Sequence, residues 1–242
     1  MKNKIGGVFF DCWDTLITFN LINPDWNYLS IKNHAINANE INWDEVSKFC
    51  KQFYHDYYAA NLNYELQIEQ IISLIVLTFH IKLDCSLETI SHEFLIYLDP
   101  KPVKNIEKFI DFLNKEGITY ACLSNTIYKK DDTLAILNKI IPNLKLSSLL
   151  ASCDIGVKKP NPLFFQAGVK ELNLDIKNCM YIGNNLFQDV YGSHISGFKY
   201  SVYNSWQNDK ELQLQHHKNV TYDFAYIEIK DYLELISFME QL

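Results

Sequence analysis

The sequence predicts an α/β protein with a doubly wound, mainly parallel sheet. Short apolar runs rich in β-branched and aromatic residues alternate with segments of helical periodicity, and several of these runs stop abruptly at polar residues. Between residues 20 and 99 long helical periodicities replace this alternation. We therefore expect an α/β core formed by residues 1–18 and 100–242, with residues 19–99 inserted as a separate helical layer.

The first strand is expected over Ile5–Phe10, an apolar run that ends abruptly at Asp11. Helical periodicity in the inserted layer covers Trp43–Ala60, Glu65–Phe79 and Leu87–Leu98. Aromatic side chains are frequent in this layer, and we expect them to form its core rather than ligand contacts. They are Trp26, Tyr28, Trp43, Phe49, Phe53, Tyr54, Tyr57 and Tyr58.

The alternation of strands and helices returns after Pro102. Apolar positions from Val103 to Leu113 predict a helix that Gly117 closes as a C-cap residue. Because strands joined through helices pair in parallel, their carboxyl ends should meet at one edge of the sheet. The further strands are expected at Ile118–Leu123, Leu149–Ala151, Cys179–Ile182, Tyr200–Val202 and, more weakly, Phe224–Ile227. The further helices are expected from about Asp131, over Leu163–Leu172 and over Tyr232–Leu242.

Composition narrows the class of protein. A net charge of -7 and the lack of basic runs argue against nucleic-acid binding. All 22 basic residues are lysine, so an anion must be bound by Lys, His or backbone amides. The six cysteines form no CxxC pair, which predicts reduced, buried thiols. The short apolar run near residue 5 fits neither a signal peptide nor a membrane span. We therefore expect a cytoplasmic protein that does not associate with membranes.

Four polar clusters follow predicted strands or occupy a loop. In chain order they are Asp11-Cys12-Trp13-Asp14-Thr15, Ser124-Asn125, the Gly156–Pro162 loop with Lys159, and Gly183-Asn184-Asn185 followed by Asp189. Together they resemble the haloacid dehalogenase superfamily, in the branch that carries a helical cap after the first motif. The resemblance extends over essentially the whole chain and implies that residues 19–99 form this cap.

The resemblance implies hydrolysis of a small phosphorylated metabolite through a covalent intermediate on Asp11. A carboxylate is an effective nucleophile because it is ionised at neutral pH without tuning. The phosphate charge must then be offset by a metal ion, a lysine and hydrogen-bond donors. By resemblance, Lys159 holds the phosphoryl group, while Ser124 and the amide of Asn125 bind its oxygens. The resemblance also implies that Trp13 and Thr15 contact the substrate. The expected ligands of Mg²⁺ are Asp11, the Trp13 carbonyl, Asn184 and Asp189.

Structural roles remain as alternatives for several of these residues. Asp11 could be a helix cap or a turn residue. For Thr15, capping of the following segment is favoured over a role at the site. The Asp14 carboxylate could satisfy loop amides. Lys158 is interpreted as a solvated neighbour of Lys159, and His194, on a helix face, is not assigned a catalytic role, nor is any other histidine.

Two departures from the family pattern weaken the phosphatase prediction. Trp13 occupies the position at which the family's phosphatases carry a second aspartate that acts as general acid and base. Loss of such a group lowers rates about 10²–10⁴-fold, or roughly 3–5 kcal/mol of barrier. Asn184 replaces a magnesium-binding aspartate, which leaves Asp11 and Asp189 as the only carboxylates of the predicted site. We therefore predict weak, millimolar magnesium binding.

Three functions remain open. The first is a slow magnesium-assisted phosphomonoesterase. The second is a carbon–halogen hydrolase, since haloacid dehalogenases also carry an aromatic residue at the Trp13 position; however, they bind the halide through an arginine, which this chain lacks. The third is a non-catalytic phosphate-binding protein in which Trp13 fills the reaction site. The sequence predicts neither the substrate nor the oligomeric state.

Overall fold

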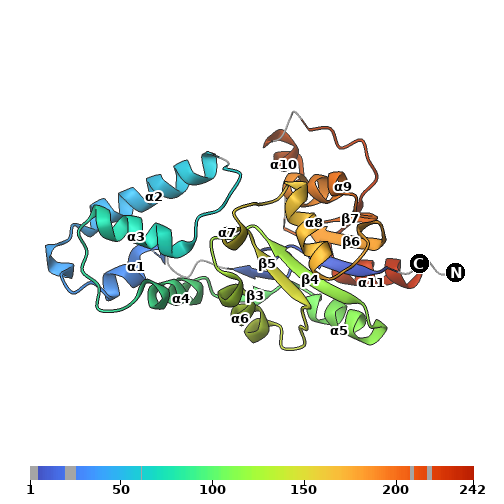
Figure 1. Cartoon of the computed structure of the whole chain (residues 1–242), viewed down its shortest axis with the longest axis horizontal. Coiled ribbons are helices and arrows are strands. Elements are labelled where there is room, and N and C mark those ends of the chain that lie inside the picture. The colour runs from blue at the N-terminus through green and yellow to red at the C-terminus, as the bar shows by residue number, and fades with distance from the viewer. Residues whose placement is uncertain (1–4, 20–25, 61, 208–209, 217–219) are drawn as a thin grey trace.

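A six-stranded parallel sheet forms the centre of one of the two lobes in Figure 1. The computed structural model describes residues 5–19, 26–60, 62–207, 210–216 and 220–242. Every neighbouring pair of strands is parallel, which confirms the predicted doubly wound sheet. The strand order is β5 (Ser148–Ala151), β4 (Thr119–Ser124), β1 (Gly7–Phe10), β6 (Cys179–Gly183), β7 (Tyr200–Asn204) and β8 (Ile227–Ile229).

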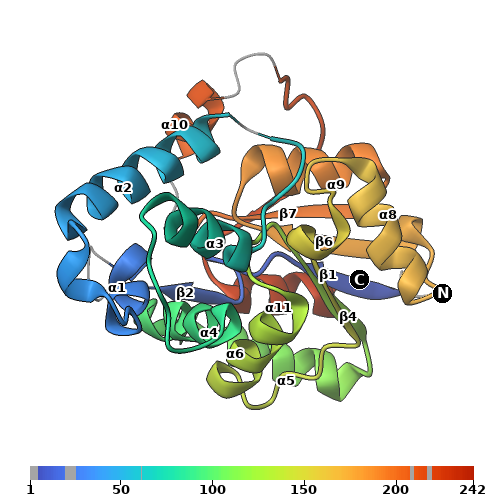
Figure 2. The same ribbon diagram turned by 60° about the vertical axis from the view of Figure 1, so that its left-hand side comes forward.

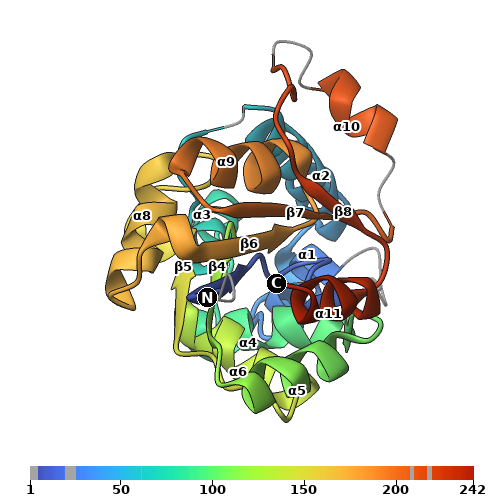
Figure 3. The same cartoon turned by 90° about the vertical axis from the view of Figure 1, so that its right-hand side faces the viewer.

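Helices cover both faces of this sheet (Figure 3). Along β1, Val8 and Phe10 pack on one helical layer, whereas Phe9 packs on the other. Because both faces are buried, the strand is apolar throughout and does not alternate. The first layer contains α5 (Ile106–Glu116), α6 (Lys130–Ile140) and α11 (Tyr232–Glu240); the second contains α8 (Pro162–Glu171) and α9 (Gly192–Ser196).

Two details of this lobe bear on the sequence predictions. Gly117 ends α5 with a φ of 64°, in the left-handed region expected of a glycine C-cap. The last strand was expected near Phe224–Ile227 but begins at Ile227. Phe224 and Tyr226 instead pack against a buried cluster that includes Tyr203 and Leu186, so their rings serve packing before strand pairing starts. None of the described helices is long and apolar enough to cross a membrane.

The second lobe consists of helices, and its apolar core also takes in Ile127 and Tyr128 from the segment that follows β4. Predicted helix bounds in this lobe agree with the structure to within three residues. Asn42 and Ser86 cap two of the helices by accepting hydrogen bonds from backbone amides. The helices are α1 (Trp26–Asn33), the short η1 (Ala38–Glu40), α2 (Trp43–Ala59), α3 (Ile68–Thr78) and α4 (Leu87–Tyr97).

Most of the aromatic residues noted in this segment contribute to its core, with Tyr28 and Tyr57 buried and Trp43 and Phe49 partly buried against it. Tyr58 is the exception, since 62% of it is exposed. The side chain of Trp26 lies outside the described part of the chain.

A two-stranded antiparallel ribbon lies where the chain leaves the sheet-containing lobe and returns to it. It pairs β2 (Ile17–Phe19) with β3 (Pro100–Pro102). The sequence did not predict this pairing, because two of the three β3 residues are prolines, which lack the N–H that a strand normally donates.

The two lobes are also joined by polar contacts, and Figure 2 shows α4 of the helical lobe beside α6 of the other. The His92 and Asp132 side chains form an ion pair at 2.6 Å between these helices. The amide of Ile68 donates to the carbonyl of Ile127 at 2.8 Å, which fixes the start of α3 beside the segment that follows β4.

Candidate functional site

Lys159 lies at the centre of the polar groups that follow β1, β4 and β6. Its side chain is 1% exposed. Its ammonium nitrogen donates to Asp11 Oδ1 at 2.6 Å, to Asp189 Oδ1 at 2.6 Å and to the Tyr181 hydroxyl at 2.8 Å. An ammonium group has three N–H donors, so each of them has one acceptor. The resulting cluster holds one positive and two negative groups in a buried position.

This arrangement shifts the pKa values of its members. Burial raises the pKa of Asp11; the Lys159 ammonium opposes this rise and the Asp189 carboxylate adds to it. The ionisation of Asp11 therefore depends on tuning, contrary to the expectation: desolvation favours its neutral form, and the Lys159 ammonium favours its ionised form. Burial alone would lower the pKa of Lys159, but the two carboxylates outweigh it and raise that pKa, so the lysine stays charged.

Tyr181 is a member of this cluster that the sequence interpretation did not assign. It pairs with Phe9 in the register of β1 and β6, within the apolar layer covered by α8. Its hydroxyl also lies 3.2 Å from the Leu123 carbonyl and 3.3 Å from Asp189 Oδ1. Burial and the adjacent carboxylates raise the pKa of Tyr181, which keeps this hydroxyl protonated. A tyrosine within a fully buried strand is a usable signal, since its hydroxyl needs a partner.

Asp189 is held by backbone as well as by Lys159. Its Oδ2 accepts from the amide of Asn185 at 2.9 Å. Gly183 permits this approach, because a Cβ atom at that position would lie 2.3 Å from Asp189 Cγ. Asp189 itself belongs to a single π-helical segment, Leu186–Tyr191, which the sequence did not predict. Such segments are frequent at functional sites.

The loop after β4 supplies two contrasting residues. Ser124 is fully buried, and its hydroxyl has no hydrogen-bond partner among the described residues. A buried hydroxyl without a partner is unfavourable and suits a bound ligand oxygen. Asn125 was predicted to bind substrate; its side chain clamps the backbone of Lys159, accepting from its amide at 2.8 Å and donating to its carbonyl at 3.0 Å.

The loop after β1 is held by local hydrogen bonds. Asp14 adopts a left-handed φ of 56°, and its carboxylate accepts from Thr18 at 2.7 Å, so it faces away from Asp11. The Thr15 hydroxyl lies 3.4 Å from Asp11 Oδ2, and the Thr15 carbonyl accepts from Tyr232. Thr15 therefore supports the loop and borders the carboxylate at the same time.

Three groups that can ligate a cation converge at this site: the Asp11 carboxylate, the Trp13 carbonyl and the Asn184 amide. One terminal atom of the Asn184 amide lies 3.2 Å from the Trp13 carbonyl oxygen and 3.2 Å from Asp11 Oδ2. As nitrogen, this atom donates to both; as oxygen, it completes a set of three oxygens. Adjacent oxygens around octahedral Mg²⁺ lie about 3 Å apart, so the spacing fits such an ion. Both oxygens of Asp189 have protein partners, which leaves one carboxylate in the set.

Residues 5–192 match the family profile of haloacid dehalogenase-like hydrolases. The chain belongs to this family. It is 23% identical over 246 residues to the glyceraldehyde 3-phosphate phosphatase of Pyrococcus furiosus, covering 96% of this chain and 93% of that protein.

Solved structures of this family share the fold. A HAD phosphatase from Thermococcus onnurineus superimposes with a TM-score of 0.65 at 17% identity, over 96% of this chain and 97% of its own. The 2-haloacid dehalogenase of Pseudomonas syringae pv. Tomato superimposes with a TM-score of 0.58 at 15% identity, over 97% of this chain and 98% of its own. Both neighbours therefore support the HAD-like fold of this chain.

Two lesser predictions can be compared with this HAD-like structure. Lys158 was interpreted as solvated, which is wrong: its side chain is 13% exposed and its ammonium group pairs with Glu65 of the helical lobe at 2.9 Å. The Glu65 carboxylate also accepts from the Tyr57 hydroxyl at 2.5 Å. His194 is exposed on α9, where its ring stacks on that of Phe224 with centroids 3.8 Å apart. No catalytic role is assigned to it.

Proposed function

We propose that this HAD-like hydrolase is a phosphomonoesterase that uses Asp11 as its nucleophile. The observation that carries the proposal is the Lys159 ammonium, which bridges Asp11 and Asp189. The Ser124 hydroxyl, at the end of the neighbouring strand β4, has no partner among the described residues. A fixed cation and free hydrogen-bond donors next to a carboxylate suit a reaction in which a dianionic phosphate must approach an anion. The name of the Pyrococcus relative supports the same substrate class.

The proposed reaction has two steps. A carboxylate oxygen of Asp11 forms a bond to phosphorus while the ester P–O bond breaks and the alcohol leaves with a proton from solvent. Water then attacks the aspartyl-phosphate, the bond between Asp11 and phosphorus breaks, and inorganic phosphate and the free carboxylate are restored. Lys159 offsets the phosphoryl charge in both steps, and the Ser124 hydroxyl and the backbone amide of Asn125 bind phosphoryl oxygens. Trp13 can neither donate nor accept the required protons, so substrates with good leaving groups are favoured.

We propose that Asp11, the Trp13 carbonyl and Asn184 hold Mg²⁺, with Asp189 acting chiefly through Lys159. The ion would supply positive charge to the phosphoryl oxygens when bound. One carboxylate and two neutral carbonyl oxygens form a weak magnesium set. The residues of the helical lobe, 19–99, are proposed to act as the cap that closes this site.

Turnover of an aryl phosphate, measured with and without Mg²⁺, tests the proposal. The wild-type protein should release inorganic phosphate, and an Asp11→Asn variant should not, because an amide is a poor nucleophile. Chloride release from a 2-halo acid in place of phosphate release would favour the dehalogenase alternative. Absence of both activities would favour the non-catalytic alternative.

A further inference from the structure

We propose that the substrate of this site carries an apolar ring, preferably aromatic, as its organic group. The inference deepens the proposed phosphatase function and rests on it for the phosphate half of the substrate. It is carried by an open pocket of about 390 Å³ that borders the predicted nucleophile loop. That volume lies within the range of about 300–1,000 Å³ typical of small-molecule sites.

The pocket adjoins the proposed reaction centre on two sides. Trp13, two residues after Asp11, forms one wall, and Asn125, directly after the buried Ser124, forms another. The Trp13 carbonyl lies 3.2 Å from the same Asn184 atom that contacts Asp11 Oδ2. A phosphate bound between Asp11 and Ser124 would therefore direct its ester group toward this pocket.

Aromatic rings surround most of the remaining wall. The Trp13 ring packs edge-on against Phe19, with centroids 5.8 Å apart, and lies 6.1 Å from the ring of Tyr128. Leu98 and Ile127 complete the apolar lining, to which none of the described residues contributes a charged side chain. Such a surface favours flat apolar groups, which gain both burial and ring contacts.

Two polar side chains of the lining, Asn125 and Thr126, are directed to other partners, and the Tyr128 hydroxyl is buried without a partner among the described residues. The side-chain amide of Asn125 forms hydrogen bonds with the Lys159 backbone and with the Gln188 side chain. The Thr126 hydroxyl accepts from the Tyr128 amide at 3.1 Å. Hydroxyl or aldehyde groups of a triose or polyol phosphate would thus lose water and gain few hydrogen bonds in this largely apolar lining. This argues against the small polar substrate for which the Pyrococcus relative is named.

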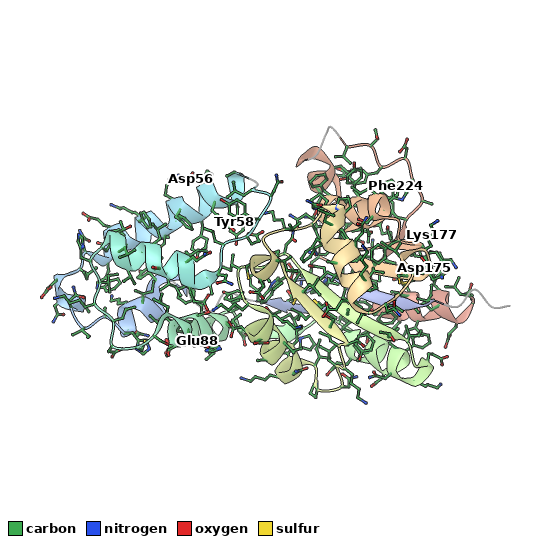
Figure 4. All side chains as sticks on the ribbon, in the orientation of Figure 1. Asp56, Tyr58, Glu88, Asp175, Lys177 and Phe224 are labelled. Atoms are coloured by element: carbon green, nitrogen blue, oxygen red, sulfur yellow. The ribbon has the colours of Figure 1, made fainter. Side chains whose placement is uncertain are left out.

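Tyr58 supplies a ring that is poised for a ligand. It lies near the C-terminal end of α2, on the side of the helical lobe that faces the sheet-containing lobe (Figure 4). Unlike Trp13 and Tyr128, it is largely exposed, at 62%. A substrate ring in the pocket would cover this exposed face. Because Tyr58 is exposed in the free protein, replacing it should not disturb folding.

Two primary-alcohol esters, benzyl phosphate and glycerol 3-phosphate, test the inference with matched leaving-group chemistry. The wild-type protein should show a higher kcat/KM for benzyl phosphate. Tyr58→Ala should lower that kcat/KM about tenfold, while changing the value for glycerol 3-phosphate less than about twofold. Tyr58→Phe should retain the preference because it keeps the ring. Leu77→Ala, which removes a 70% exposed side chain from α3 outside the pocket, serves as the control.

Fluorescence titration with 2-naphthol separates the pocket from the chemistry. The wild-type protein should bind this neutral ring, and Tyr58→Ala should weaken binding several-fold. If naphthol binds in this way but no phosphomonoester is hydrolysed, the ligand chemistry stands and the phosphatase proposal fails. If both phosphate esters are hydrolysed equally, or glycerol 3-phosphate is preferred, and naphthol does not bind, the inference is overturned while the phosphatase proposal stands.

Discussion

Lys159 is buried at a position where an isolated ammonium group would be strongly destabilising. Three acceptors in the right places make its burial tolerable, and two of them, Asp11 and Asp189, are negatively charged. The third acceptor, Tyr181, is neutral and fixes the direction of the remaining N–H. We therefore propose that the tyrosine hydroxyl positions Lys159, the lysine proposed to face the substrate.

Replacing Tyr181 by Phe should lower kcat about tenfold with little change in KM, because one N–H of Lys159 loses its acceptor and the ammonium group can shift. Steady-state kinetics with an aryl phosphate measure this effect, and the pH profile of kcat should shift with it. Tyr120→Phe removes a buried hydroxyl that bonds to Asn114 near the start of β4, and it should leave kcat unchanged. Equal effects of both variants on kcat would argue against a positioning role.

Asn184 limits the predicted magnesium site because it contributes a neutral oxygen. Asn184→Asp should raise the affinity for Mg²⁺ at least tenfold, since it places a second carboxylate beside the Trp13 carbonyl and Asp11. Isothermal titration with MgCl₂ measures this without reference to activity. A sub-micromolar dissociation constant for the wild-type protein would contradict the weak-site account.

The order of polar clusters in the sequence was sufficient to predict which residues gather around Asp11. Lys159 and Asn184 contact Asp11, Asp189 contacts Lys159, and Ser124 ends the neighbouring strand, because parallel strands bring their carboxyl ends to one edge. The contacts of Asn125 could not be predicted in the same way. Its role depends on the backbone position of Lys159 in a distant loop, which no local pattern encodes.

At the level of elements, the helical lobe is stabilised by contacts between His34, which follows α1, and two carboxylates, one just before α4 and one within it. Both ring nitrogens of His34 face carboxylates, Asp84 and Glu93, each at 2.8 Å. Both nitrogens can donate only when the ring is protonated. The hydrogen bond to Glu93, followed by that to Asp84, accordingly raises the pKa of His34 above its ordinary value of 6.5.

This contact should make stability depend on pH. Because the folded-state pKa is raised, the stabilisation is fully present below about pH 6.5 and is lost as the pH rises through the folded-state pKa. The difference in Tm between wild-type and His34→Gln proteins should be larger at pH 6 than at pH 8.5. His55→Gln, at a 76% exposed side chain on α2, provides the control. A difference that does not change with pH would exclude the ion pairs as its cause.

Glu65 joins the two lobes through Lys158, and both side chains are mostly buried. Glu65→Gln should lower the free energy of unfolding by about 1–3 kcal/mol, because Lys158 keeps its charge and loses its counter-charge. Urea unfolding measures the loss. Adding Lys158→Met should restore part of it, since the charge is then removed. Glu228→Gln, in a more exposed pair with Lys210, should cost less than about 1 kcal/mol. Equal losses from the two single variants would refute the argument from burial.

Helical periodicity predicted α2 and α4 closely, whereas the start of α3 was placed three residues too early. Leu66, within the expected helix, instead donates its amide to the Tyr57 hydroxyl. This contact joins residues that lie on different elements, so periodicity could not reveal it. The same applies to β2 and β3, whose pairing depends on tertiary structure rather than on strand propensity.

For the whole molecule, alternating strands and helices were enough to predict the parallel sheet, because few topologies satisfy the rules of parallel connection. The relation between the lobes could not be predicted, since it depends on individual contacts such as His92 with Asp132. This relation matters for the proposed substrate preference, because the aromatic pocket is formed jointly by Trp13 and Tyr128 of one lobe and Tyr58 of the other.

The two proposed chemical steps should differ in rate. Transfer of a phosphoryl group to Asp11 needs no acid when the leaving group is good, whereas hydrolysis of the aspartyl-phosphate needs a base that Trp13 does not supply. The covalent intermediate should therefore accumulate.

Stopped-flow measurement of nitrophenol release from 4-nitrophenyl phosphate tests this account most directly. We predict a burst of about one equivalent of nitrophenol per chain, followed by slow turnover, with both phases absent in Asp11→Asn. Linear release without a burst, continuing undiminished in Asp11→Asn, would contradict the assignment of Asp11 as the nucleophile.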